Sequence, residues 1–269
     1  MAKNVQRVVV TAGASGIGLA IAQKFLAEGA RVFICDIDTS ALEKSLTSNT
    51  GLQGTLADVG DPLSVEAFFT KALSALNGID VLINNAGIGG PRAKVEDIDY
   101  QDWDDCIRIN LSGMFYCVKQ VIPAMKAQGS GCIINISTSS AKTGLPNRLP
   151  YVASKVGVLG LSHNLARELG KSNIRVNTIL PGLMDNPRGR ALVSKYANEN
   201  NLSEQAAETE FLKYISLKSW IKPGEIADAA FFLASNQAQH ITGQEIAVDG
   251  NCEWNSNTPR FCYPSGSGV

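Results

Sequence analysis

The feature that most constrains the fold is a regular alternation of short apolar runs with longer segments of helical spacing. Apolar runs rich in β-branched residues cover residues 7–11, 31–35, 80–83, 131–136 and 174–180, and glycine or a polar residue follows each within two positions. Runs this apolar are typical of strands covered on both faces, as in parallel sheets. The alternation predicts an α/β domain: a doubly wound parallel sheet flanked by helices on both faces, with ligands at the carboxyl ends of the strands.

Length and composition narrow the class of protein. With 269 residues, 45% of them hydrophobic, the chain can bury one full core, and we expect a single domain over residues 1–269. A net charge of −1 predicts no nucleic-acid partner and no attraction to a membrane. We find no signal-peptide pattern and no apolar run long enough for a membrane span, so we expect a cytoplasmic protein. Six scattered cysteines and two distant histidines predict reduced thiols and no metal site.

The first apolar run opens into a glycine-rich turn that is suited to a dinucleotide. Residues 12–18 follow the strand expected at 7–11 and precede a helical pattern at 19–29. Small residues let the backbone approach a pyrophosphate, and the next helix contributes N–H groups and the positive end of its dipole. The spacing departs from the usual G-x-G-x-x-G, so a glycine turn without a ligand stays a second interpretation. The expected cofactor contacts are Gly13, Ser15, Gly16, Ile17 and Gly18.

An acidic residue at the end of the second strand indicates which dinucleotide is bound. Asp36 lies 18 residues beyond Gly18, where a carboxylate binds the adenosine ribose hydroxyls and repels a 2′-phosphate. We therefore expect NAD rather than NADP. Asp58 and Val59 follow a strand expected at 52–56, and the Asp58 carboxylate either accepts from the adenine amine or belongs to a surface turn.

A tyrosine and a lysine four residues apart predict a proton-transfer site. Tyr151 and Lys155 lie on one face of a helix expected from 151 to about 170, after the strand at 131–136. A nearby ammonium favours the phenolate, as a general acid or base near neutral pH requires. Tyr214 and Lys218 repeat the spacing without a preceding core strand, so we expect Lys218 to be solvated.

These residues together resemble the short-chain dehydrogenase/reductase superfamily, a Rossmann-like fold, from about residue 7 to 249. Residues 11–18 resemble its T-G-x-x-x-G-x-G turn, residues 84–87 its N-N-A-G motif, Tyr151 and Lys155 its Y-x-x-x-K motif, and residues 181–182 its P-G motif. The resemblance implies that Tyr151 exchanges a proton with the substrate oxygen, while Lys155 also holds the nicotinamide ribose and Asn110 supports a water chain. It also implies cofactor contacts at Asn85, Ala86, Gly87, Pro181, Gly182, Met184 and Asn186.

Three positions depart from the pattern of the family. Ala12 replaces the first glycine of the turn, which requires a negative φ there or a slightly altered turn, and we expect cofactor binding to survive. Thr138 stands where the family has its catalytic serine, and neighbouring Ser139 is the alternative hydroxyl. Asn186 stands where the family has a threonine, and its amide can replace that hydroxyl toward the cofactor.

The segment at about 186–222 is expected to form a substrate lid with two helices, at 188–200 and 203–217. Three arginines lie near the expected site in sequence: Arg92, Arg148 and, at the start of the lid, Arg188 or else Arg190. Arginine suits carboxylates and phosphates. The three arginines predict a small polar substrate, including an anionic one, bound also by Thr138, Ser139 and Tyr151; surface arginines are the other interpretation.

Residues 241–250 resemble the last strand of the family, which implies a homo-oligomer, a tetramer or a dimer. The tail at about 251–269 is expected to pack near a neighbouring site and to end flexibly. The leading hypothesis is an NAD-dependent oxidoreductase that interconverts a secondary alcohol and a ketone of a sugar, sugar acid, polyol or hydroxy acid. A carbonyl reductase of acyl-type or cyclic ketones is the alternative within enzymes, and a non-catalytic NAD-binding protein is the alternative outside them.

Overall fold

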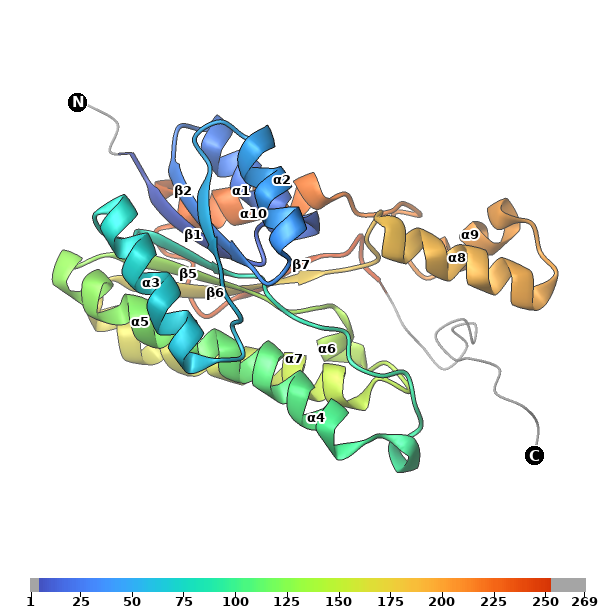
Figure 1. Cartoon of the computed structure of the whole chain (residues 1–269). Helices are drawn as coiled ribbons and strands as arrows, with labels where there is room; N and C mark the ends of the chain where they lie inside the picture. The colour runs from blue at the N-terminus through green and yellow to red at the C-terminus, as the bar shows by residue number, and fades with distance from the viewer. Residues whose placement is uncertain (1–4, 253–269) are drawn as a thin grey trace.

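The computed structural model describes residues 5–252 and contains one seven-stranded parallel sheet (Figure 1). The strand order is β3-β2-β1-β4-β5-β6-β7. The order reverses between β1 and β4, and such a reversal opens a crevice at the carboxyl ends of the two strands. The doubly wound sheet predicted from the sequence is confirmed. The strands are β1 (Arg7–Thr11), β2 (Arg31–Asp36), β3 (Gln53–Leu56), β4 (Val81–Asn84), β5 (Gly131–Ile136), β6 (Ile174–Pro181) and β7 (Glu245–Val248).

Helices cover both faces of the sheet, and each layer has its own apolar core (Figure 1). On one face, Ile21, Leu42 and Ile226 bury the helices α1 (Gly16–Ala27), α2 (Thr39–Ser48) and α10 (Pro223–Ala234) against alternate strand residues. On the other face, the core joins α3 (Pro62–Leu76), α5 (Gly113–Gln128) and α7 (Leu149–Leu169). The remaining helices are α4 (Tyr100–Ile107), α6 (Ser140–Thr143), α8 (Pro187–Asn200) and α9 (Glu204–Leu212).

Local signals fix several helix ends. The carboxylate of Asp61 accepts from the backbone N–H of Leu63 at 3.1 Å, and Pro62 occupies the first turn, where its missing N–H costs nothing. Asn77 ends the same helix in the left-handed conformation, with φ 59°. These three residues account for the bounds of α3, Pro62–Leu76.

A π-helical turn at Arg108–Ser112 separates α4 from α5. The second lid helix was expected to reach residue 217, but α9 ends at Leu212. Lys218 then has φ 50°, is exposed, and donates its ammonium hydrogen to the carbonyl of Lys213. Tyr214 and Lys218 therefore do not share a helical turn, and Lys218 is solvated as expected.

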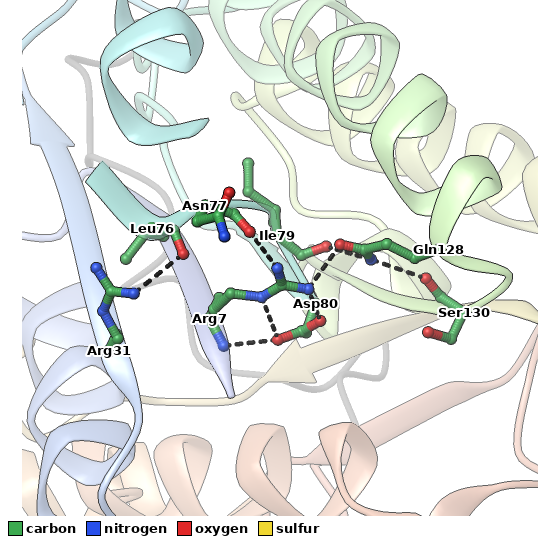
Figure 2. A network of polar contacts seen from close by, with 8 residues as sticks. All are labelled: Arg7, Arg31, Leu76, Asn77, Ile79, Asp80, Gln128 and Ser130. Atoms are coloured by element: carbon green, nitrogen blue, oxygen red, sulfur yellow. Dashed lines mark hydrogen bonds and ion pairs between the residues drawn. The ribbon is translucent and has the colours of Figure 1, made fainter. Parts of the chain in front are cut away.

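A polar network joins the amino ends of the strands, opposite the end where ligands are expected (Figure 2). The Asp80 carboxylate accepts from the backbone N–H of Arg7 at 2.9 Å, from its Nε at 2.9 Å and from its Nη2 at 2.6 Å. The same guanidinium donates to the side chain of Gln128 and to the carbonyl of Asn77. The network ties the start of β1 to the ends of α3 and α5.

Across residues 5–252, no helix is both long and apolar enough to cross a lipid bilayer. Within the same range, no three side chains of the types His, Cys, Asp and Glu gather closely enough to hold a metal ion. Cys35, Cys106, Cys117 and Cys132 are free and buried, Cys252 is buried, and Cys262 lies outside the described residues. Burial raises the pKa of the Cys35 thiol to about 12 and that of Cys132 to about 11, so both thiols stay protonated and unreactive at neutral pH.

Candidate active site

A cavity of about 500 Å³ opens at the carboxyl ends of β1, β4, β5 and β6. Most of the residues predicted for the site line it: Ser15, Gly16, Ile17, Asn85, Gly87, Arg92, Thr138, Ser139, Arg148, Tyr151, Lys155, Pro181, Gly182, Met184 and Asn186. Several apolar lining residues were not predicted: Ile88, Ile136, Leu145, Leu183, Leu192 and Phe211. The other predicted residues Gly13, Gly18, Asp36, Asp58, Val59, Ala86 and Asn110 are not part of the lining of this cavity.

The glycine turn has a shape that fits a dinucleotide pyrophosphate. A Cβ on Gly18 would lie 2.1 Å from the carbonyl oxygen of Ala12, so only glycine allows α1 to pack this closely on the turn. Gly16 has φ +53° and nothing within 4 Å of an ideal Cβ, which leaves open space beside the first turn of α1. The helix N-terminus faces this space, where a phosphate finds N–H groups and positive dipole.

Ala12 adopts the left-handed conformation, with φ 48°. Of the two alternatives expected for Ala12, a negative φ or a slightly altered turn, the negative φ is not found. Alanine therefore carries the strain of a side chain at positive φ. The turn is held from β4, because the side-chain amide of Asn85 donates to the carbonyl of Ala12 at 3.1 Å and Thr11 Oγ1 accepts from the backbone N–H of Asn85 at 3.0 Å.

Asp36 is positioned beside the same turn. Its carboxylate accepts from the backbone N–H of Ala14 at 3.1 Å and from that of Asp38 at 3.1 Å. These bonds fix a negative charge at the end of β2, next to the loop that would hold the adenosine half of a cofactor. Asp58 is already engaged, since its carboxylate accepts from Gly60 N–H at 2.7 Å and from Arg108 Nη1 at 3.4 Å.

Asn110 is a buried side chain with three partners. Its Oδ1 accepts from the backbone N–H of Ile88 at 2.7 Å, and its Nδ2 donates to the Ile88 carbonyl and to Ser154 Oγ, each at 2.9 Å. The amide therefore joins the loop after β4 to α7, across the π-helical turn. A Cβ on Gly87 would lie 3.0 Å from Asn110 Oδ1 and 3.2 Å from Lys155 Nζ, so these three residues converge under the cavity floor.

Lys155 is 5% exposed, and its ammonium donates to the carbonyl of Ile136 at 2.9 Å. Burial lowers the pKa of Lys155 to about 8. Tyr151 lies one turn earlier on α7 and is half-buried in the cavity wall. Helix α7 thus presents both a phenol and an ammonium to the same cavity.

The hydroxyl groups that follow β5 differ in the hydrogen bonds that they already make. Ser137 donates to the carbonyl of Lys155 at 2.9 Å, so its hydroxyl proton is engaged. Thr138 Oγ1 accepts from the backbone N–H of Ser140 at 3.3 Å, which leaves its own proton for another acceptor. Thr138 and Ser139 both line the cavity and are 8% and 7% exposed. Either hydroxyl can donate to a ligand oxygen there.

The three arginines have different surroundings. Arg92 is exposed at the rim of the cavity. Arg148 is 5% exposed, its Nη2 donates to the carbonyl of Gly89 at 2.5 Å, and its Cζ lies 5.2 Å from the centroid of the Tyr151 ring. Arg188 belongs to α8, and its side chain lies outside the described part of the structure.

Helices α8 and α9 form a unit with its own core, which extends away from the sheet in Figure 1. The unit covers one side of the cavity with Leu192 from α8 and Phe211 from α9. Arg190 holds it together, because its guanidinium bonds Asp185 and Glu208 and lies 4.5 Å over the ring of Trp220. Met184 pairs with Ile221 at the junction with the sheet.

A doubly wound sheet with a glycine turn at its reversal point, together with a tyrosine and a lysine on the helix after β5, defines a class of nicotinamide-dependent oxidoreductases. The chain belongs to the short-chain dehydrogenase/reductase superfamily. A family model described as enoyl-(acyl carrier protein) reductase matches residues 11–251. Members of this superfamily act on alcohol and carbonyl groups.

The relatives include enzymes named as dehydrogenases of alcohols and enzymes named as reductases of ketones. The D-threitol dehydrogenase of Mycolicibacterium smegmatis is 36% identical over 255 residues, which are 90% of each chain. A variant of actinorhodin polyketide ketoreductase, crystallised with NADPH, has a TM-score of 0.86 and 31% identity over 93% of this chain and 98% of its own. An NAD+-bound xylitol dehydrogenase also has a TM-score of 0.86, with 27% identity over 93% of this chain and 100% of its own.

Proposed function

We propose that the protein is an NAD-dependent dehydrogenase that interconverts a secondary alcohol and a ketone, with Tyr151 as the proton acid and base. One observation carries the proposal: Tyr151 and Lys155, one turn apart on α7, line the same cavity as Gly16 in the phosphate-binding turn. A cofactor on that turn and a substrate beside the phenol would therefore share one cavity.

In the oxidation direction, Tyr151 takes the proton of the substrate hydroxyl. The Lys155 ammonium stabilises the phenolate and holds the nicotinamide ribose, while a hydroxyl of Thr138, or of Ser139, donates to the substrate oxygen. Asn110 holds the loop at Ile88 against helix α7 through hydrogen bonds to both. It also supports proton exchange with solvent. When bound, the nicotinamide supplies the hydride acceptor.

NAD is the proposed cofactor because of the charge at Asp36. Its carboxylate is fixed beside the turn and would meet a 2′-phosphate, whereas the ribose hydroxyls of NAD can donate to it. The backbone and side chains of Gly13, Ser15, Ile17, Ala86, Gly87, Pro181, Gly182, Met184 and Asn186 complete the proposed contacts to the cofactor, with Asp58 and Val59 at the adenine.

For the substrate, we propose a small polar hydroxy compound such as a polyol, a sugar acid or a hydroxy acid. Arg92 at the cavity rim supports a polar or anionic group, and the likeness to threitol and xylitol dehydrogenases supports a polyol. Residues 186–222 serve as the substrate lid.

Reduction of acyl-type or cyclic ketones is the second candidate function. It is favoured by the likeness to a polyketide ketoreductase and by the apolar wall at Phe211. A homo-oligomer, a tetramer or a dimer, belongs to the proposal.

The deciding experiment is a screen of polyols, hydroxy acids and cyclic alcohols with NAD+ and NADP+, followed by the absorbance of the reduced nicotinamide. We expect turnover with NAD+ that is lost in Tyr151→Phe, while NAD+ binding is retained. Turnover close to wild type in Tyr151→Phe would remove the assigned proton donor. Tight NAD+ binding without turnover of any compound would favour a non-catalytic NAD-binding protein.

A further inference from the structure

Arg148 is a buried cation in direct contact with the proposed acid and base. It is the residue before the first turn of α7, three positions ahead of Tyr151. Only 5% of its surface is exposed, although arginine is rarely buried to this extent without a specific role. A structural role alone would not require its position in the cavity wall.

Two contacts fix the plane of the guanidinium. Nη2 donates to the carbonyl of Gly89 at 2.5 Å, in the loop that follows β4. The Cζ atom lies 5.2 Å from the centroid of the Tyr151 ring, within the range of a cation–π contact. Arg148 therefore connects the loop after β4 with the ring of Tyr151.

The charge of Arg148 acts on the same ring. A cation near an aromatic face is attracted to its electrons, and the attraction grows when the phenol loses its proton and the ring oxygen becomes negative. The Cys106 thiol on α4 is close enough for the charges of Arg148 and Lys155 to act on it, and so are the carboxylates of Asp102 and Asp105 on the same helix. Arg148 and Lys155 are thus two cations that lie within about one helical turn of Tyr151, one before it and one after it.

We propose that Arg148 is a positioning residue for Tyr151: it orients the phenol ring and stabilises its deprotonated form, rather than binding an anionic group of the substrate. The inference rests on the proposed alcohol and ketone chemistry. It gives Arg148 a different role from the one predicted from the sequence, where Arg148 was a substrate contact. Arg92 is left as the arginine available to a substrate anion.

Kinetics of Arg148→Gln, with Arg92→Gln as the matched control, test the assignment. A charge about 5 Å from the ring, partly screened by solvent, corresponds to a shift of about one pH unit. In Arg148→Gln, we expect the acid limb of the pH profile of kcat to shift to higher pH by about one unit. At pH values below this limb, kcat should be about tenfold lower than in wild type, and the KM for NAD+ should be unchanged. Arg148→Lys keeps the charge and should recover part of the loss. Arg92→Gln should change the KM of charged substrates and leave the limb in place.

A second readout does not depend on turnover. The ultraviolet signal of tyrosinate, taken as wild type minus Tyr151→Phe, should have its midpoint at higher pH when the same difference is measured in the Arg148→Gln background. An unchanged midpoint and pH limb, with a raised KM for anionic substrates only, would overturn the inference and return Arg148 to the substrate. If wild type oxidises no alcohol while the tyrosinate midpoint still moves, the proposed function fails and the effect of Arg148 on Tyr151 stands.

Discussion

Lys155 is predicted to lower the free energy of unfolding of the protein, although its ammonium is needed for turnover. Its ammonium is buried, and the pKa of about 8 lies below the ordinary value of 10.5. Each pKa unit corresponds to about 1.4 kcal/mol, so holding this lysine charged in the folded protein costs about 3 kcal/mol at pH 7. The bond from Nζ to the Ile136 carbonyl offsets about 1 kcal/mol.

Lys155→Met replaces the ammonium by an unbranched apolar side chain of similar length. At pH 7 the variant should be more stable than wild type by about 2 kcal/mol, which is the cost of the buried charge less the lost hydrogen bond. Its turnover should be lost, since the phenolate of Tyr151 and the nicotinamide ribose lose their cation.

The sign of the pH dependence follows from the direction of the shift. Because the folded pKa is below the unfolded one, the cost is full below pH 8 and disappears as pH rises from about 8 to 10.5. The advantage of Lys155→Met should therefore fall from about 2 kcal/mol at pH 7 to about zero near pH 9.5.

Urea unfolding without nucleotide, at pH 7 and pH 9.5, measures both free energies of unfolding. Lys44→Met is the control, because Lys44 is an exposed lysine in the middle of α2, and its effect should be small and equal at the two pH values. Equal destabilisation by Lys155→Met at both pH values would refute the reasoning, since the ammonium would then be stabilised rather than penalised by its site.

Three further predictions concern the cofactor and the fold. Asp36→Asn keeps the acceptor for Ala14 N–H but removes the charge, so the preference for NAD+ over NADP+ in kcat/KM should fall by about tenfold or more, and an unchanged ratio would reject Asp36 as its source. Gly18→Ala would place a Cβ 2.1 Å from the Ala12 carbonyl, so calorimetry should find NAD+ binding weakened at least tenfold; wild-type affinity would show that the turn can move apart. Asp80→Ala removes three bonds from Arg7 (Figure 2) and should lower the free energy of unfolding by about 2 kcal/mol. Its kcat should match wild type, because the network lies at the opposite end of the sheet.

The sheet and the position of the site could be predicted because their causes are local. Strands apolar enough for burial on both faces, together with cap residues such as Asp61 and Asn77, determine elements without reference to distant parts of the chain. Once the strands are parallel, their carboxyl ends share one edge of the sheet, so the ends of β2 and β5, which carry Asp36 and Thr138, had to lie at that edge.

The parts that the sequence did not predict depend on contacts between distant residues. The π-helical turn accompanies the bonds of Asn110 to both backbone groups of Ile88, 22 residues away, and helical periodicity cannot indicate such a contact. The stacking of Arg148 on Tyr151 likewise depends on the Gly89 carbonyl, 59 residues away. Phe211 and Leu192 were missed because their apolar character is equally typical of a core position.

The separate core of α8 and α9 allows the substrate side of the cavity to change by substitution independently of the sheet. Val193, Ala207 and Phe211 pack with Trp220 rather than with either layer of the sheet. Replacement of the side chains at Leu192 and Phe211 would reshape the cavity wall while the glycine turn, Asp36 and Lys155 keep their neighbours. Selection, natural or in the laboratory, can therefore exchange one substrate for another in this chain without rebuilding its dinucleotide half.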